Sequence, residues 1–201
     1  MIYKYKYCDS LSSINIPNSV TTIGYWGLRT CKSLTSITIP NSVVTIIGNP
    51  FYLWQGNLYN ESKAFIYEDH VLFNKNKTTL IAYRAKETDY TIPNSVTTIG
   101  DSAFECCNSL TSINIPNSVT TIGEGAFSYC ESLTSIDIPN SATTIGNSAF
   151  AMCKSLTSIN IPNSVTTIEY SAFYGCINLP SHIKSDIIQR FGEKVFDLYF
   201  F

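Results

Sequence analysis

The sequence predicts a repeat solenoid built mainly of β-strands, with short helical or 3-10 turns and a helical cap at the C-terminus. The first observation is a block, Ile-Pro-Asn-Ser, that recurs along the chain at Ile16, Ile39, Ile92, Ile115, Ile138 and Ile161. Neighbouring blocks are 23 residues apart, except that the second and third are 53 apart, one ordinary step plus 30. The second observation is that the sequences between successive blocks are nearly identical. Each repeat is therefore expected to form one coil.

These blocks divide residues 1–180 into a part-coil, a regular coil, a long coil, three regular coils and a last coil: 1–15, 16–38, 39–91, 92–114, 115–137, 138–160 and 161–180. Residues 181–201 are expected to form the cap. The segment Tyr5-Lys6-Tyr7-Cys8 matches Phe127-Ser128-Tyr129-Cys130, so the chain is expected to begin inside a coil. Either a longer protein has been cut, or this uncapped first coil contacts a partner end to end.

Within one coil, Leu110–Ile115 alternates apolar and polar residues, which predicts a short strand with one buried face. Pro116 lacks the N–H of a strand ladder and ends it. Val119–Ile122 is a second β-prone piece, and Gly123 permits a tight corner. Ala126-Phe127 then returns apolar bulk to the core, through an expected turn of helix.

Stacking coils at about 4.8 Å places equivalent side chains in columns. The expected core columns are Leu34/Leu110/Leu133/Leu156, Ile37/Ile113/Ile136/Ile159 and Phe104/Phe127/Phe150/Phe173. Six cysteines also follow the period: Cys8, Cys31, Cys107, Cys130, Cys153 and Cys176. Parallel thiols do not converge on a point, so a ladder of reduced, buried cysteines is predicted and no metal site. Cys106 lies off the column and is expected to be the reactive thiol.

The long coil contains two β-prone runs, Phe65–Phe73 and Thr78–Tyr83, joined by Asn74–Lys77. Asn and Lys between such runs predict a hairpin. We interpret this insertion as scaffold, with a dedicated ligand-binding insertion as the alternative.

The last segment predicts a helix that Ser181 caps and Gly192 ends. Its apolar residues fall on one side: Ile183, Ile187, Ile188 and Phe191. Together with the apolar Val195–Phe201, this helix is expected to close the last coil. A membrane-surface role is the alternative, but the helix lacks the basic face that such a role requires.

The repeated phrase Ile-Pro-x-Ser-Val-Thr-x-Ile-Gly-x-x-Ala-Phe-x-x-Cys-x-x-Leu-Thr-x-Ile resembles the BspA-like class of leucine-rich repeats over about residues 5–180. This resemblance implies a right-handed leucine-rich-repeat coil. It also implies a secreted or cell-surface location and binding of host extracellular matrix or surface proteins. The pattern is altered at Ala142, at Glu169 and at Gly27-Leu28, where looser corners are expected.

The composition argues against several other functions. A net charge of −2 gives no electrostatic reason to expect nucleic acid, and no apolar run approaches the ~20 residues that span a bilayer. The first residues show no signal-peptide pattern, so the chain itself leaves its location open. His70 and His182 are isolated from any nucleophile, and the carboxylates are scattered. We therefore expect no enzyme activity, no metal and no cofactor.

Candidate binding residues fall into two groups. The first group lies on the polar face of the strands: Thr38, Asn114, Asp137 and Asn160. The second group occupies positions that vary between coils: Tyr25, Trp26, Arg29, Tyr129, Met152, Tyr170 and Tyr174. Exposed aromatic side chains are enriched among interface hot spots, although several of these residues would equally well pack between coils.

The sequence thus predicts a non-catalytic binding module that recognises a protein partner. One alternative is a structural spacer or stalk of a larger surface protein. A remote alternative is binding to a regular lattice such as ice through rows of threonine: Thr21-Thr22, Thr97-Thr98, Thr120-Thr121, Thr143-Thr144 and Thr166-Thr167. The oligomeric state stays open.

Overall fold

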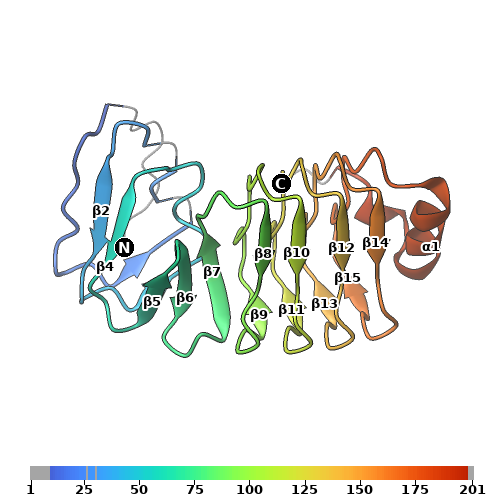
Figure 1. Ribbon diagram of the computed structural model, residues 1–201, viewed down its shortest axis with the longest axis horizontal. Helices are drawn as coiled ribbons and strands as arrows, with labels where there is room; N and C mark the ends of the chain where they lie inside the picture. The colour runs from blue at the N-terminus through green and yellow to red at the C-terminus, as the bar shows by residue number, and fades with distance from the viewer. Residues whose placement is uncertain (1–9, 26, 30, 199–201) are drawn as a thin grey trace. The chain divides into compact units, whose positions relative to one another are not determined.

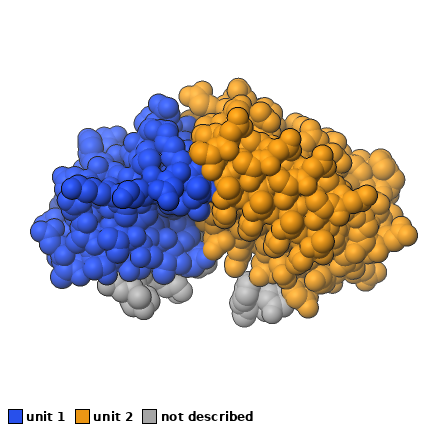
Figure 2. Space-filling view, turned by 90° about the horizontal axis from the view of Figure 1, so that it is seen from below, with its two compact units in different colours: residues 1–85 blue, residues 86–201 orange. Residues whose placement is uncertain are grey.

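The computed structural model describes residues 10–25, 27–29 and 31–198. It is a β-solenoid of short, mostly parallel strands with one C-terminal helix (Figure 1), as the sequence predicts. The chain divides into two compact units, residues 1–85 and 86–201, which Figure 2 shows in different colours. The predicted part-coil and Cys8 lie outside the described residues, apart from the stretch from Ser10 onward.

The second unit contains two series of parallel strands. One series consists of β8 (Asp89–Thr91), β10 (Ser112–Asn114), β12 (Ser135–Asp137) and β14 (Ser158–Asn160). The other series consists of β9 (Thr98–Ile99), β11 (Thr121–Ile122), β13 (Thr144–Ile145) and β15 (Thr167–Ile168). Pairing joins residues 23 positions apart, for example Thr121 with Thr144. The 23-residue repeat is therefore the register of the fold.

Local chemistry explains how each coil turns. In β12 the buried Ile136 lies between the exposed Ser135 and Asp137. After the equivalent strand of the preceding coil, the N–H of Val119 donates to the carbonyl of Pro116 at 3.1 Å and closes a tight turn. Gly123–Cys130 then forms a run of hydrogen-bonded turns, in which the N–H of Phe127 donates across to the next coil.

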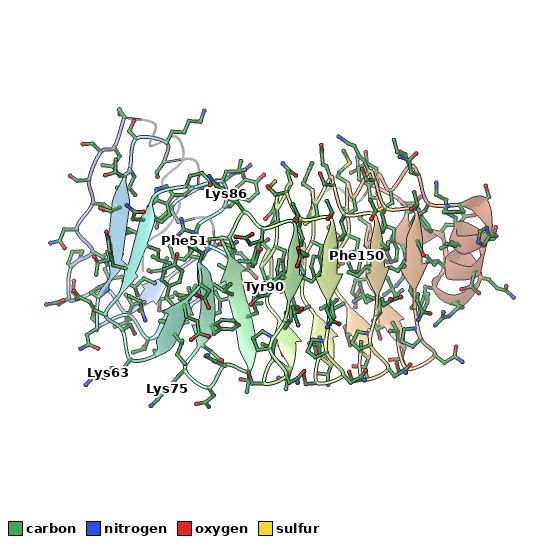
Figure 3. The ribbon with its side chains drawn as sticks, in the orientation of Figure 1. Phe51, Lys63, Lys75, Lys86, Tyr90 and Phe150 are labelled. Carbon is green, nitrogen blue, oxygen red and sulfur yellow. The ribbon has the colours of Figure 1, made fainter. Side chains whose placement is uncertain are left out.

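The core of the second unit is a stack of phenylalanine rings. Successive centroids from Phe104 through Phe127 and Phe150 to Phe173 are 4.9, 5.3 and 5.5 Å apart, and the rings are nearly parallel. All four are fully buried, and Figure 3 labels Phe150. The predicted phenylalanine column is confirmed. The residues of the predicted leucine and isoleucine columns are all buried except Ile113, which is only half-buried.

The thiols of the second unit form the predicted reduced column. The Sγ atoms of Cys130, Cys153 and Cys176 each donate to a phenylalanine carbonyl 26 residues earlier, at 3.1–3.2 Å. Burial raises the pKa of Cys107, Cys130 and Cys153 well above that of a free thiol, and it raises the pKa of Cys176 to about 12. Cys106 and Cys107 are both only partly buried, so the predicted burial of the column is confirmed at Cys130, Cys153 and Cys176 and not at Cys107.

The first unit also contains paired coils, followed by an antiparallel region. Its strands are β1 (Thr22–Ile23), β2 (Ser36–Ile39), β3 (Thr45–Ile46), β4 (Asn57–Asn60), β5 (Phe65–Glu68), β6 (Val71–Asn74) and β7 (Thr79–Tyr83). Strand β1 pairs with β3 and β2 with β4, both in parallel. The predicted hairpin across Asn74–Lys77 is confirmed by the antiparallel pairing of β6 with β7. The β-prone run Phe65–Phe73 forms two strands. Asp69 and His70 adopt φ of 47° and 62° and form a tight turn, so β5, β6 and β7 are a three-stranded antiparallel meander.

Arg84 ties this meander to the loop that precedes β4. Its guanidinium lies 4.5 Å from the ring centroid of Trp54 and donates to the carbonyls of Trp54 and Gly56 and to the Tyr67 hydroxyl. Desolvation lowers the pKa of this guanidinium, which the hydroxyl of Tyr67 partly offsets. The indole of Trp54 donates in turn to the carbonyl of Leu34 at 2.7 Å. These contacts support the interpretation of the insertion as scaffold.

The C-terminal segment closes the second unit with helix α1 (Ser181–Phe191) and a 3-10 turn η1 (Glu193–Val195). Ser181 is the first helical residue and makes no side-chain cap, because Pro180 occupies the N-cap position; the predicted capping role was wrong. Gly192 ends the helix with φ of 86°, as expected. On the predicted apolar side Ile187 is buried, whereas Ile188 is exposed.

The residues after the helix continue the repeat. The N–H of Phe173 donates to the carbonyl of Val195 at 2.8 Å. The ring of Phe196 lies 5.8 Å from that of Phe173, and the two residues are 23 positions apart in sequence. The helix itself is anchored by Arg190, whose guanidinium donates to the carbonyls of Ile161 and Pro162. The core column therefore ends under a partial coil.

We predict that Phe150→Ala lowers the free energy of unfolding by about 3–5 kcal/mol, because it opens a cavity inside the ring stack. Chemical denaturation followed by circular dichroism measures this change. Ile177→Ala is the matched control, since Ile177 is 67% exposed, and it should change stability little. Equal losses in both variants would contradict a stack that carries the stability.

We predict that Cys130, Cys153 and Cys176 react with a thiol reagent at least about tenfold more slowly than Cys106 in the native protein at pH near 8. Their raised pKa leaves few thiolates, and burial blocks access. Site-resolved mass spectrometry after brief alkylation measures the rates, and all these thiols should react alike in denaturant. Fast native labelling of Cys130 would contradict the buried column.

Candidate functional site

The exposed side chains of β8, β10, β12 and β14 form one polar surface, called the strand face below. Because side chains alternate along a strand, the first and third residues of each strand point outward. The middle residue is buried in β12 and β14, whereas Ile113 of β10 is only half-buried. The strand face consists of Asp89, Thr91, Ser112, Asn114, Ser135, Asp137, Ser158 and Asn160, all exposed. The structure therefore brings three sequence-predicted residues together: Asn114, Asp137 and Asn160.

The side chains at the third strand position are not used by the fold. Within the described part of the chain, Asn114, Asp137 and Asn160 make no side-chain hydrogen bond or ion pair. Their amide and carboxylate groups are open to solvent. Such groups can exchange bonds to water for bonds to a partner at little cost.

A hollow of about 310 Å³ lies on this surface. It is lined by residues of β8 and β10 together with one residue of β12: Asp89, Tyr90, Thr91, Ser112, Ile113, Asn114, Ile115 and Asp137. Strand β10 pairs with β8 and β12 pairs with β14, so the two pairs form separate two-stranded sheets. At this interruption Ile113 is half-buried, whereas its equivalents Ile136 and Ile159 are 2% and 8% exposed.

The threonine rows behave differently from the strand face. The hydroxyls of Thr120, Thr143 and Thr166 each donate to the carbonyl of the threonine one coil earlier, at 3.2–3.4 Å. A second row, Thr111, Thr134 and Thr157, repeats this pattern at 2.9–3.4 Å. These hydroxyl protons therefore hold adjacent coils together.

Two variable residues pack between the coils of their own units. A Cβ atom on Gly48 would clash with the ring of Tyr25, and one on Gly175 would clash with the Sδ of Met152. Each glycine follows its partner by 23 residues. Glycine at these positions therefore makes room for the side chain of the preceding coil.

Two further candidates form cation–π contacts. The guanidinium of Arg29 lies 4.7 Å from the ring centroid of Tyr52, and the ammonium of Lys194 lies 5.0 Å from that of Tyr170. Thr38 lies on β2 of the first unit, in register with Tyr59. Trp26 lies outside the described residues, and Tyr174 is half-buried.

Tyr129 has an unusual backbone conformation for an aromatic residue. It is 41% exposed and adopts a φ of 58°, in the left-handed region that bulky residues avoid. The same position of neighbouring coils holds Cys106, Met152 and Gly175, also with positive φ. The turn geometry is thus common to these four coils of the second unit, and the tyrosine adopts it.

Charge within the second unit is strongly one-sided, a feature that the overall net charge conceals. From Glu87 to Cys153 the chain contains seven carboxylates and no lysine or arginine. Two of them crowd at a corner, where the N–H of Glu124 donates to the Asp101 carboxylate at 3.0 Å. Desolvation and the Asp101 charge raise the pKa of Glu124. A local charge count along the sequence would have found this segregation.

The described residues were also compared with the requirements of a metal site and of a membrane-spanning helix. Across residues 10–25, 27–29 and 31–198 there is no group of three or more His, Cys, Asp or Glu side chains placed to hold a metal ion. Over the same residues, no helix has the length and apolar character needed to cross a membrane.

Comparison with known proteins agrees with this architecture. The model of the BspA type leucine rich repeat region matches residues 2–76 and 81–199, with six copies. A leucine-rich repeat protein from Eubacterium ventriosum is similar in structure, with 35% identity and a TM-score of 0.74, over 82% of this chain and 45% of that one. A leucine rich cell surface protein from Faecalibacterium prausnitzii shows 32% identity and a TM-score of 0.56, over 82% and 51% of the two chains.

The pneumococcal vaccine antigen PcpA shares the fold, with 20% identity and a TM-score of 0.59, over 89% of this chain and 58% of that one. No curated protein matches the chain. The chain spans about half the length of the first two solved relatives. With the repeat, the stacked core and a family match over nearly its whole length, the chain belongs to the BspA type leucine-rich repeat family.

Proposed function

We propose that this chain is a non-catalytic protein-recognition module and that the strand face of the second unit is its binding surface. The observation that carries this proposal is that some exposed polar side chains form hydrogen bonds within the fold, while those of the strand face do not. The side chains of Asn114, Asp137 and Asn160 are exposed and form no hydrogen bond within the described fold. The hydroxyls of Thr120 and Thr143, by contrast, donate hydrogen bonds to the preceding coil. A parallel array of free donors and acceptors suits many hydrogen bonds to a protein surface.

The family supports a location at the cell surface. One relative is described as a leucine rich cell surface protein, and repeat proteins commonly bind partners along an extended face. We propose a protein of the host extracellular matrix or cell surface as the partner. Tyr129 and Tyr170 are proposed to contribute at the edges, and Tyr25, Trp26, Arg29, Thr38, Met152 and Tyr174 remain further candidates.

A spacer or stalk is the second candidate function. The stack of four phenylalanine rings, extended by Phe196, favours it because a continuous packed column resists bending. In that case the strand face would serve only solubility. The two functions are compatible within one longer protein.

We predict that the chain captures at least one protein from an array of extracellular matrix proteins, and that Ser135→Trp weakens this capture by about tenfold or more. The bulky ring would stand in the centre of the strand face and exclude a partner. The control, Asn163→Trp, places the same ring on an exposed turn and should bind normally. If no protein binds, or if both variants lose binding equally, recognition by the strand face is contradicted and the spacer is favoured.

We predict no thermal hysteresis during freezing, because the hydroxyl protons of Thr120, Thr143 and Thr166 are already donated within the protein. Nanolitre osmometry measures the gap between melting and freezing points. A gap that disappears in Thr143→Val would instead favour lattice binding.

A further inference from the structure

We infer that the partner presents a basic segment to the strand face, and that a lysine or arginine side chain of this segment enters the hollow between Asp89 and Asp137. This inference rests on the proposed function and specifies the chemistry of its partner.

The first support is the excess of carboxylates in the part of the second unit that contains the hollow. The stretch from Glu87 to Cys153 carries seven carboxylates and no lysine or arginine, and the exposed Lys86 directly precedes it. Lys154, the first cation after this stretch, is occupied by an ion pair with Glu131 at 2.8 Å. This part of the second unit therefore has an excess of negative charge, which would steer a positively charged segment toward it.

The second support is the position of the two aspartates. They are the only charged residues of the strand face, and both line the hollow. Asp89 is in register with Ser112, and Asp137 is in register with Asn160. Elsewhere the strand face carries serine, threonine or asparagine at these positions, so both charges lie where the repeat departs from its usual residues.

The third support is the shape and lining of the hollow. At about 310 Å³ it is near the lower limit of ligand pockets, ~300 Å³, which suits one long side chain better than a whole small molecule. The half-buried Ile113 offers apolar contact to the methylene stem of lysine or arginine. Asp89, Asp137 and the unused amide of Asn114 supply oxygen acceptors for the charged end.

The repeat itself supplies variants that should fold. Asp137→Asn converts Ser-Ile-Asp into Ser-Ile-Asn, the sequence already present in β10 and β14. Asp89→Ser introduces the residue with which Asp89 is in register. Loss of binding in the double variant would therefore report on charge and not on folding.

The test uses two synthetic peptides, acetyl-(Ser-Arg)₄-amide and acetyl-(Ser-Gln)₄-amide, titrated into the full chain and followed by the NMR signal of the Ile113 methyl group. We expect saturable shifts with the arginine peptide alone. The dissociation constant should rise about tenfold or more in Asp89→Ser/Asp137→Asn, and it should rise with salt as screening increases. The matched control Glu124→Gln/Glu169→Gln removes the same charge away from the hollow and should bind within about twofold of wild type.

Several results would overturn the inference. Three results would each exclude binding of a basic side chain in the hollow: equal shifts with the glutamine peptide, no response at Ile113, or equal losses of affinity in the two double variants. Calcium chloride alone is a further arm: saturable shifts with calcium and none with the arginine peptide would make the hollow a metal site instead.

The two proposals fail in different ways. If a matrix protein binds wild type and Asp89→Ser/Asp137→Asn equally well, protein recognition stands and the basic side chain in the hollow is wrong. If the arginine peptide shows the expected pattern while no matrix protein binds, the hollow stands and the proposed class of partner is wrong.

Discussion

The structure depends on one constraint: each coil can bury its apolar face only against the coil 23 residues away. Parallel pairing such as Thr121 with Thr144 sets this register, and the stacked rings of Phe104 to Phe173 fill the interior that it creates. Departures from the repeat must respect the same register. In the long coil, Arg84 holds the extra strands by hydrogen bonds to the loop before β4. At the C-terminus, Val195 and Phe196 contact Phe173 as the residues of a further coil would. Scaffold residues are therefore repeated, and function is left to residues that point outward.

Among the outward residues, hydrogen bonding separates two classes that look alike in sequence. The threonine rows donate to carbonyls of the preceding coil and belong to the scaffold, although they are exposed. The strand face has no such bonds at Asn114, Asp137 and Asn160. Asp89 and Asp137 then distinguish one part of that face, around the hollow lined by β8, β10 and Asp137. Two aspartates and one interruption of strand pairing thus make this part of the strand face different from the rest of the repeat.

The interior could be predicted from sequence because burial imposes the period: the Phe and Leu columns follow from spacing alone. Errors occurred where no residue type marks the backbone change. Asp69 and His70 adopt left-handed φ without glycine, so the turn between β5 and β6 was missed. The role of Phe196 was missed because its segment lacks the Ile-Pro-Asn-Ser block, although its 23-residue offset from Phe173 was readable. The hollow could not be predicted, since β10 and β12 are nearly identical in sequence and differ in how they pair. The local excess of carboxylates could have been counted.

The central claim is that the repeat builds a scaffold and that the strand face is its main surface for recognition. Hydrogen exchange of the chain with and without a captured extracellular protein tests this claim most directly, because it locates the contact without any substitution. The account predicts added protection in β8, β10, β12 and β14 and unchanged exchange in β9, β11, β13 and β15. Protection confined to the threonine strands, or to the turns around Tyr129, would contradict it.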